Sequence, residues 1–216
     1  MTPEAVRRHF EETGALLAGH FRLSSGLHAD RYLQCAKVLQ HPDRAAALGA
    51  ALAALLAPER PGVVVSPAMG GVVIGHEVGR ALGVRAIFTE RVDGAFALRR
   101  GFGLAEGERV AVIEDVVTTG KSTKEVLDVV RESGAEPVAC GAIVDRRALA
   151  VGGVDRRALA VGGVDRRALA VGGVGGVPFR ALLALEVPAW EPAACPLCAR
   201  GEPLVAPGSR HLAAKA

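Results

Sequence analysis

The chain has little of what secreted and membrane-spanning proteins depend on. Its 216 residues include only four cysteines, too few and too scattered for a disulfide scaffold, so we expect a reducing compartment. The amino terminus is charged and contains no apolar signal core, and the longest apolar run, residues 45–57, is too short to cross a bilayer. We therefore expect a cytoplasmic protein that makes no membrane contact.

An excess of charge of one sign is also missing. The 26 basic and 23 acidic residues give a formal net charge of +3, which is too balanced to imply a nucleic-acid surface. Small anions are not excluded as partners. Half of the residues are hydrophobic, enough to bury a sizeable core, and we expect residues 1–216 to form a single domain.

Apolar strands alternate with helical segments along most of the chain, which predicts an α/β fold with a parallel sheet flanked by helices on both faces. A hairpin is expected in HFRLSSGLHADRYLQC, and both a loop region ending at Leu104 and the Pro- and Gly-rich tail are expected to be irregular. The predicted helices are 3–13, about 43–57, GGVVIGHEVGRALG and STKEVLDVVRESG, and the strands are GVVVSP, VRAIFTE, RVAVIED and PVACGAIVD.

A ten-residue sequence, VDRRALAVGG, occurs three times without a change, at 144–153, 154–163 and 164–173. Solenoid repeats are longer and diverge. We therefore interpret residues 154–173 as inserted copies, from a recent tandem duplication or a flaw in the recorded sequence, that form a loop between two strands.

The stretch IEDVVTTGKST, residues 113–123, ends like a nucleotide-binding phosphate loop. Such a loop needs a glycine five residues before the glycine of Gly-Lys-Ser, but that position is Asp115. Together with Glu114 it would repel a polyphosphate unless a metal or sugar hydroxyls intervened. A strand that ends in two carboxylates, followed by a Thr- and Gly-containing turn that opens a helix, instead suits a ribose and its 5-phosphate. The alternative is a turn whose hydroxyls only cap the helix.

In these residues the chain resembles the type I phosphoribosyltransferases, and it is most similar to the orotate phosphoribosyltransferase family. The stretches HFRLSSGLHADRYLQC, SPAMGGVVIGHEV, VDR and LEVPAWEPAACPLCARGEPLVAPGSR carry the narrower likeness. The resemblance implies a small hood, made by the amino-terminal hairpin and the carboxy-terminal segment, over a parallel sheet. It also implies Mg²⁺-dependent transfer of ribose 5-phosphate from phosphoribosyl diphosphate to orotate, and a homodimer.

The resemblance assigns roles to individual residues. Glu114 and Asp115 are implied to hold the ribose hydroxyls, and Thr118 also to touch orotate. Arg146 is implied to pair with the orotate carboxylate, for which a guanidinium fork is well suited; a solvated loop arginine is the alternative. The residues implied to bind the 5-phosphate are Val116, Val117, Thr118, Thr119, Gly120, Lys121 and Ser122.

Several cations typical of the family are missing. A lysine near Ser24 is absent, and Gly70 stands where many members have lysine. In the segment that corresponds to the family's mobile loop, the only cations are Arg91, Arg99 and Arg100, which we take as the catalytic cations over the diphosphate. For Arg99 and Arg100 the alternative is plain surface charge.

The pair Cys195 and Cys198 in CPLC has the spacing of half a zinc site. The other half is not evident, because Cys35 and Cys140 have no partner at short spacing, and the histidines, His20 and His28 among them, form no ligand pattern. We therefore expect no metal bound by protein side chains.

Two other functions fit the ribose site. A regulatory protein that senses phosphoribosyl diphosphate would need a nucleic-acid surface, and the balanced charge offers none. A phosphoribosyltransferase for another base would differ at the hood and at Arg146, since a neutral purine has no carboxylate for the guanidinium.

Overall fold

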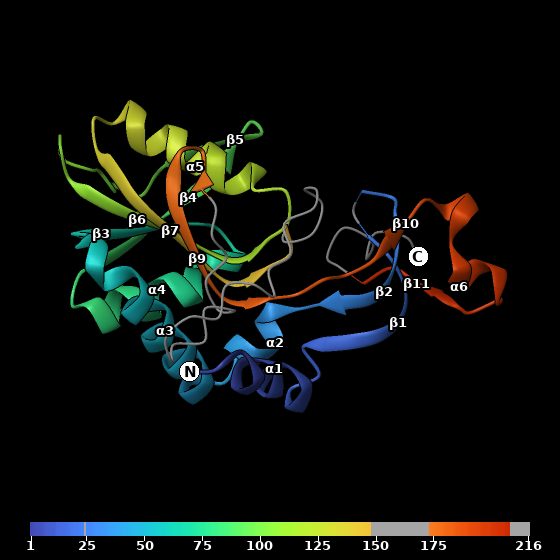
Figure 1. The fold of residues 1–216 in the computed structure, drawn as a ribbon. Helices are drawn as coiled ribbons and strands as arrows, with labels where there is room; N and C mark the ends of the chain where they lie inside the picture. The colour runs from blue at the N-terminus through green and yellow to red at the C-terminus, as the bar shows by residue number, and fades with distance from the viewer. Residues whose placement is uncertain (24, 148–172, 208–216) are drawn as a thin grey trace.

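The computed structural model describes residues 1–23, 25–147 and 173–207, so most of the inserted copies predicted at 154–173 lie outside it. Two sheets form the molecule (Figure 1). The larger has seven strands in the order β5-β4-β3-β6-β7-β9-β8, and the smaller has four in the order β10-β2-β1-β11.

The centre of the larger sheet is parallel, as the sequence predicted. Strands β4, β3, β6, β7 and β9 run in the same direction, and only the edge strands β5 and β8 are antiparallel to their neighbours. The strands are β3 (Val63–Pro67), β4 (Arg85–Val92), β5 (Ala95–Leu98), β6 (Arg109–Val117), β7 (Glu136–Asp145), β8 (Gly173–Val174) and β9 (Val177–Ala184). Parallel strands place their carboxyl ends at one edge of the sheet, where α/β proteins bind ligands.

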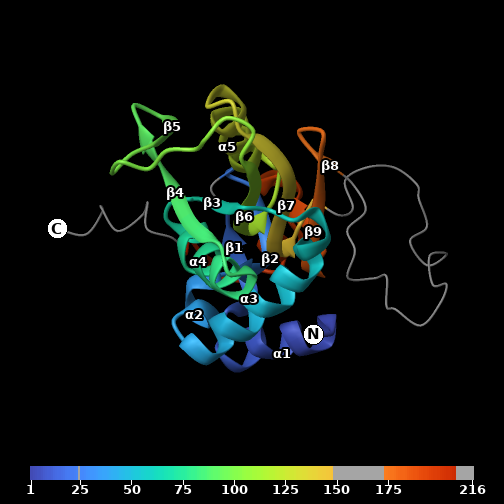
Figure 2. The same cartoon turned by 90° about the vertical axis from the view of Figure 1, so that its left-hand side faces the viewer.

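Helices cover both faces of this sheet (Figure 2). One face packs against α1 (Pro3–Glu12), α2 (Cys35–Leu39), α3 (Pro42–Leu56) and α4 (Gly70–Leu82), and the other against α5 (Lys121–Glu132). Successive strand residues enter opposite cores: Val64 joins the first core, whereas Val63 and Val65 join the second. The buried strands are therefore apolar without alternation, which is why they read as continuous hydrophobic runs.

The smaller sheet joins the two ends of the described chain. Its hairpin, β1 (Leu16–Arg22) and β2 (His28–Leu33), was predicted, and the strands on either side of it are β11 (Leu204–Val205) and β10 (Ala189–Trp190). The tail also contains η4 (Pro192–Ala194) and a short helix, α6 (Pro196–Ala199). We call this sheet with α6 the hood; it extends to the right of the larger sheet in Figure 1. The expectation of an irregular tail was therefore wrong for these elements.

Three further elements differ from the sequence prediction. The expected loop before Leu104 contains β5, which pairs with β4 through a tight turn at Asp93 and Gly94, both at positive φ. Helix α2 was not predicted, and α3 continues into a short 3₁₀ turn, η1 (Ala57–Glu59). Among the helices of the described residues, none is long and apolar enough to cross a membrane.

Candidate active site

Two acidic side chains end the buried part of β6. Glu114 is 9% exposed and Asp115 is half-buried. Burial, and next the negative charge of Asp115, raise the pKa of Glu114 to about 8, while Arg91 acts against the shift. Burial also raises the pKa of Asp115, although its carboxylate accepts a hydrogen bond from the Val116 amide at 2.8 Å. Such a buried acidic pair can bind a cation or accept hydrogen bonds from hydroxyl groups.

No cation of the described residues forms an ion pair with either carboxylate. Arg91, whose charge reaches Glu114, donates instead to Glu125 at 2.7 Å. Buried carboxylates are normally paired with a cation or bound to a metal. The lack of a cation partner among the described residues indicates that a ligand supplies the compensating charge.

The turn that follows opens α5 with free backbone amides. Thr118 and Thr119 are exposed, and Gly120 adopts φ +77°, which a side chain would strain. No side chain caps α5; within the turn, the Thr119 hydroxyl accepts from the Lys121 amide at 3.2 Å. Exposed hydroxyls and the amino end of a twelve-residue helix form a suitable site for a phosphate group.

The segment 66–71, which runs from the end of β3 into the start of α4, lies against Asp115. A Cβ placed on Gly70 would come within 2.8 Å of Asp115 Oδ1. Glycine at position 70, where many members of the family have lysine, therefore lets the start of α4 approach the Asp115 carboxylate. Met69 beside it is 82% exposed.

Two neighbouring arginines after β7, Arg146 and Arg147, differ in their hydrogen-bond partners. Arg147 binds the buried Asp145 carboxylate at 3.0 and 3.1 Å and lies over the Phe179 ring, so it is structural. Arg146 is held next to the acidic strand by its amide, which donates to the Val117 carbonyl at 2.8 Å. Its Nε is buried and has no hydrogen-bond partner in the part of the chain that the structure describes, and burial lowers its pKa. A buried guanidinium with an unused donor suits an anionic ligand.

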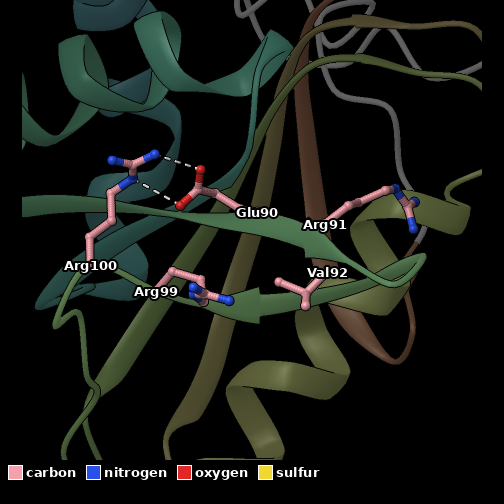
Figure 3. A pocket seen from close by; sticks show the side chains of 5 residues that line it. All are labelled: Glu90, Arg91, Val92, Arg99 and Arg100. Carbon is pink, nitrogen blue, oxygen red and sulfur yellow. Dashed lines mark hydrogen bonds and ion pairs between the residues drawn. The ribbon is translucent and has the colours of Figure 1, made fainter.

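The three arginines predicted over the diphosphate lie around the β4–β5 hairpin, where they line a depression of ≈ 400 Å³ with Glu90 and Val92 (Figure 3). Arg100 forms a bidentate pair with Glu90, both distances 2.8 Å, and Arg91 is held by Glu125, the Gly94 carbonyl and the Phe96 ring. Arg99 is exposed and has no hydrogen-bond partner among the described residues. Of the three, Arg99 is therefore the most available to a ligand.

The hood brings together four side chains that the sequence analysis did not connect: His20, His28, Cys195 and Cys198. The prediction that the histidines form no ligand pattern was wrong for His20 and His28. The two histidines face each other only because β1 and β2 pair, and CPLC reaches them only because β10 and β11 flank that hairpin. The one usable signal in the sequence was that both histidines lie in the predicted hairpin.

The comparisons with known proteins agree with this geometry. The phosphoribosyl transferase domain family matches residues 34–152. The chain is 46% identical to the orotate phosphoribosyltransferase of Pelotomaculum thermopropionicum, over 98% of this chain and 100% of the relative. It is 49% identical to that of Heliobacterium modesticaldum, over 97% of this chain and 100% of the relative.

A solved structure has the same architecture. The Mycobacterium tuberculosis orotate phosphoribosyltransferase in complex with inorganic phosphate aligns with a TM-score of 0.58 at 25% identity, covering 85% of this chain and 93% of that one. The near full-length identity to the curated relatives decides the branch of the family. The chain belongs to the phosphoribosyltransferase family and, within it, to the orotate phosphoribosyltransferases.

Proposed function

We propose that this orotate phosphoribosyltransferase carries out its reaction at the edge of the sheet formed by β6 and β7. The enzyme transfers ribose 5-phosphate from phosphoribosyl diphosphate to a ring nitrogen of orotate, giving orotidine 5'-phosphate and diphosphate for pyrimidine synthesis. The observation that carries the placement is the buried pair Glu114 and Asp115, without a cation partner in the described residues, directly before a phosphate-suited turn.

The residues have distinct roles in this proposal. Glu114 and Asp115 accept hydrogen bonds from the ribose hydroxyls, and the turn from Val116 to Ser122 binds the 5-phosphate through amides and hydroxyls. As the bond to diphosphate breaks, positive charge develops on the ribose, and the fixed carboxylates stabilise it. Because these dipoles and charges are already oriented, little reorganisation accompanies the reaction.

Arg146 selects the base. Its buried Nε, which has no partner among the described residues, supports a bidentate pair with the orotate carboxylate. Thr118 follows Val117, whose carbonyl accepts the Arg146 amide, and in this proposal it contacts the same ring. A neutral purine would leave this guanidinium buried without compensation. This favours orotate over the other bases considered above.

Mg²⁺ fits this site, because buried carboxylates without a cation are the kind of oxygen donors that it accepts next to substrate phosphates. Glu114 and Asp115 are the side chains that would lie nearest to it. Mg²⁺, when bound with the substrate, supplies charge neutralisation of the leaving diphosphate. The chain's own task is then to orient the ribose and to position the two carboxylates, while the positive charge of the bound metal and the developing ribose cation favours their ionised form against the pKa shift that burial imposes.

The first experiment follows the loss of orotate absorbance when the purified protein is mixed with phosphoribosyl diphosphate, Mg²⁺ and orotate, with adenine, hypoxanthine and uracil as parallel substrates. We expect orotate alone to be consumed, because only orotate offers a carboxylate to Arg146. Turnover of a purine, or tight phosphoribosyl diphosphate binding without turnover of any base, would contradict the proposal.

We further infer a cytoplasmic homodimer in which the β4–β5 hairpin of one subunit serves the site of the other. The support is the depression at the hairpin and the exposed Arg99 beside it, which has no hydrogen-bond partner in the part of the chain that the structure describes. In this proposal Arg91, Arg99 and Arg100 are the catalytic cations over the diphosphate. Arg100 can take this role only after it is released from Glu90.

Mixing two inactive variants tests the shared site. Arg99→Ala/Arg100→Ala and Asp115→Asn are each expected to be nearly inactive, yet exchange of subunits should restore about a quarter of the wild-type activity. Half of the dimers are then mixed, and each has one site with both sets of residues intact. No recovery despite proven subunit exchange would show that the hairpin serves its own subunit.

We also propose that residues 154–173 are inserted copies within a single domain. The chain leaves the described structure after Arg147 and returns at Gly173, and these positions touch, with Arg147 donating to the Gly173 carbonyl at 3.4 Å. Deleting 154–173 should therefore leave kcat within about twofold of wild type and the melting temperature no lower than that of wild type. A large loss of either, measured against a same-length deletion elsewhere, would contradict the insertion.

A further inference from the structure

Four potential metal ligands converge in the hood. Their ligand atoms, the two thiol sulfurs of Cys195 and Cys198 and one ring nitrogen from each of His20 and His28, all lie within 4.8 Å of one another. His20, His28 and Cys195 are 3%, 5% and 3% exposed, and Cys198 lies at the surface. The active-site proposal uses none of them.

Four of the six distances between these ligand atoms are close to the edges of a small tetrahedron. His20 Nε2 lies 3.5 Å from Cys195 Sγ and 3.6 Å from Cys198 Sγ, and His28 Nδ1 lies 3.2 Å from Cys198 Sγ. Zinc bond lengths in tetrahedral geometry place a nitrogen and a sulfur ligand ~3.6 Å apart. The two nitrogens, at 2.9 Å, are slightly closer than the ~3.3 Å that the same geometry gives.

Hydrogen bonding alone does not account for this arrangement. His20 Nδ1 lies 2.8 Å from the Glu202 carbonyl, which can only accept, so Nδ1 carries the proton and Nε2 offers one lone pair. Three groups, His28 Nδ1 and both thiols, approach that single lone pair within 3.6 Å. One lone pair accepts one such donor well, whereas a cation at the centre would engage all four ligands at once.

The surroundings are also those of a metal site. Metal-binding histidines usually donate their second ring N–H to a carbonyl or carboxylate, as His20 does to Glu202. The CxxC spacing of Cys195 and Cys198 at the start of a short helix is typical of structural zinc. Two thiolates and two neutral imidazoles give an uncharged complex with Zn²⁺, which suits a largely buried position.

We propose that His20, His28, Cys195 and Cys198 bind a structural Zn²⁺ ion. The site has four protein ligands and therefore no open position for catalysis. It joins α6, with Cys195 directly before it, to the β1–β2 hairpin, and so links the carboxy-terminal and amino-terminal parts of the hood. Zinc is favoured over an iron–sulfur cluster because the four ligand atoms, all within 4.8 Å of one another, are close enough to bind a single ion. It is favoured over Mg²⁺ because Mg²⁺ prefers oxygen ligands.

Metal analysis of the protein purified without chelator tests the proposal. We expect about one zinc per chain in the wild type and at least a tenfold lower content in Cys198→Ala and His28→Ala. The matched controls are Cys140→Ala in β7 and His76→Ala on the outer surface of α4, which should retain the metal. Cys140 is buried and unpaired, and His76 is exposed, so neither belongs to the cluster.

A second measurement does not depend on variants that fold. Wild-type protein stripped by chelator and titrated with Co²⁺ should show the ligand-field bands of tetrahedral cobalt and thiolate-to-cobalt charge transfer, saturating at about one equivalent. Less than about a tenth of an equivalent of zinc, with no such cobalt spectrum, would overturn the proposal and leave a hydrogen-bonded cluster. Iron in place of zinc would overturn it as well. Both readouts are independent of orotate turnover.

Discussion

Replacing Asp115 with asparagine is expected to lower kcat by about 10²-fold or more, because the transition state loses one of the two charges that stabilise the developing cation. Glu114→Gln should act in the same direction. Steady-state kinetics with orotate and phosphoribosyl diphosphate measure both effects. The control is Asp128→Asn on α5, whose carboxylate is 48% exposed and paired only with Arg131.

Although Glu114→Gln should lower kcat, it should raise the stability of the ligand-free protein. Glu114 has a pKa of about 8 in the folded protein against an ordinary 4.5, so between these values the folded state binds more protons than the unfolded state. Stability therefore falls as the pH rises through that window. Glu114→Gln removes the ionisable group, and at about pH 8 we expect the ligand-free variant to gain at least ~1 kcal/mol, or ~2–4 °C in melting temperature.

Thermal melts across the window test this expectation. The gain of Glu114→Gln over wild type should shrink as the pH falls toward 4.5 and vanish below it, where the unfolded glutamate also binds a proton. Glu132→Gln on the exposed surface of α5 should show no such trend. A gain that does not vary with pH would mean that burial does not hold the proton on Glu114.

Arg146→Ala is expected to raise the KM for orotate by about 10²-fold, with a much smaller change in the KM for phosphoribosyl diphosphate. The loss of one partner of a buried, hydrogen-bonded charge pair costs roughly 2–5 kcal/mol. Arg146→Lys should restore little, because a lysine offers one point charge where the carboxylate needs a planar fork.

The chain provides its own controls for this prediction. Arg156 and Arg166 have the same neighbours in sequence as Arg146 but lie in the repeated copies outside the described residues. Arg156→Ala and Arg166→Ala should leave both KM values unchanged. An equal effect of all three substitutions, or equal changes in both KM values, would remove Arg146 from the orotate site.

Much of the fold could be predicted from the sequence because the buried strands and amphipathic helices have clear hydrophobic patterns. The acidic pair and the phosphate turn were also readable, since they are contiguous in residues 113–123. Strand β5 was missed because Ala95–Leu98 is short and follows an Asp-Gly turn among charged residues. The strands of the tail were missed because each has two residues and depends on pairing with the hairpin.

Which arginines of the site are available to a ligand depends on contacts between different segments of the chain, which the local sequence does not show. Nothing local distinguishes Arg146 from Arg147; the difference is that Asp145 binds Arg147, whereas Arg146 Nε has no hydrogen-bond partner among the described residues. Likewise, nothing in the sequence shows that Arg100 pairs with Glu90 while Arg99 is exposed. Such differences arise only when the strands are assembled.

The sheet of the hood joins strands that are synthesised at very different times during translation. His20 and its partner Glu202 are 182 residues apart in sequence, so β1 emerges long before the segment that completes its sheet. At ordinary rates of translation the hairpin waits about 10–40 s for that segment. Strands β3, β4, β6 and β7 can pair on the nascent chain, but the hood sheet is complete only after β11, residues 204–205, has been synthesised, and a chain truncated before β11 lacks the complete hood.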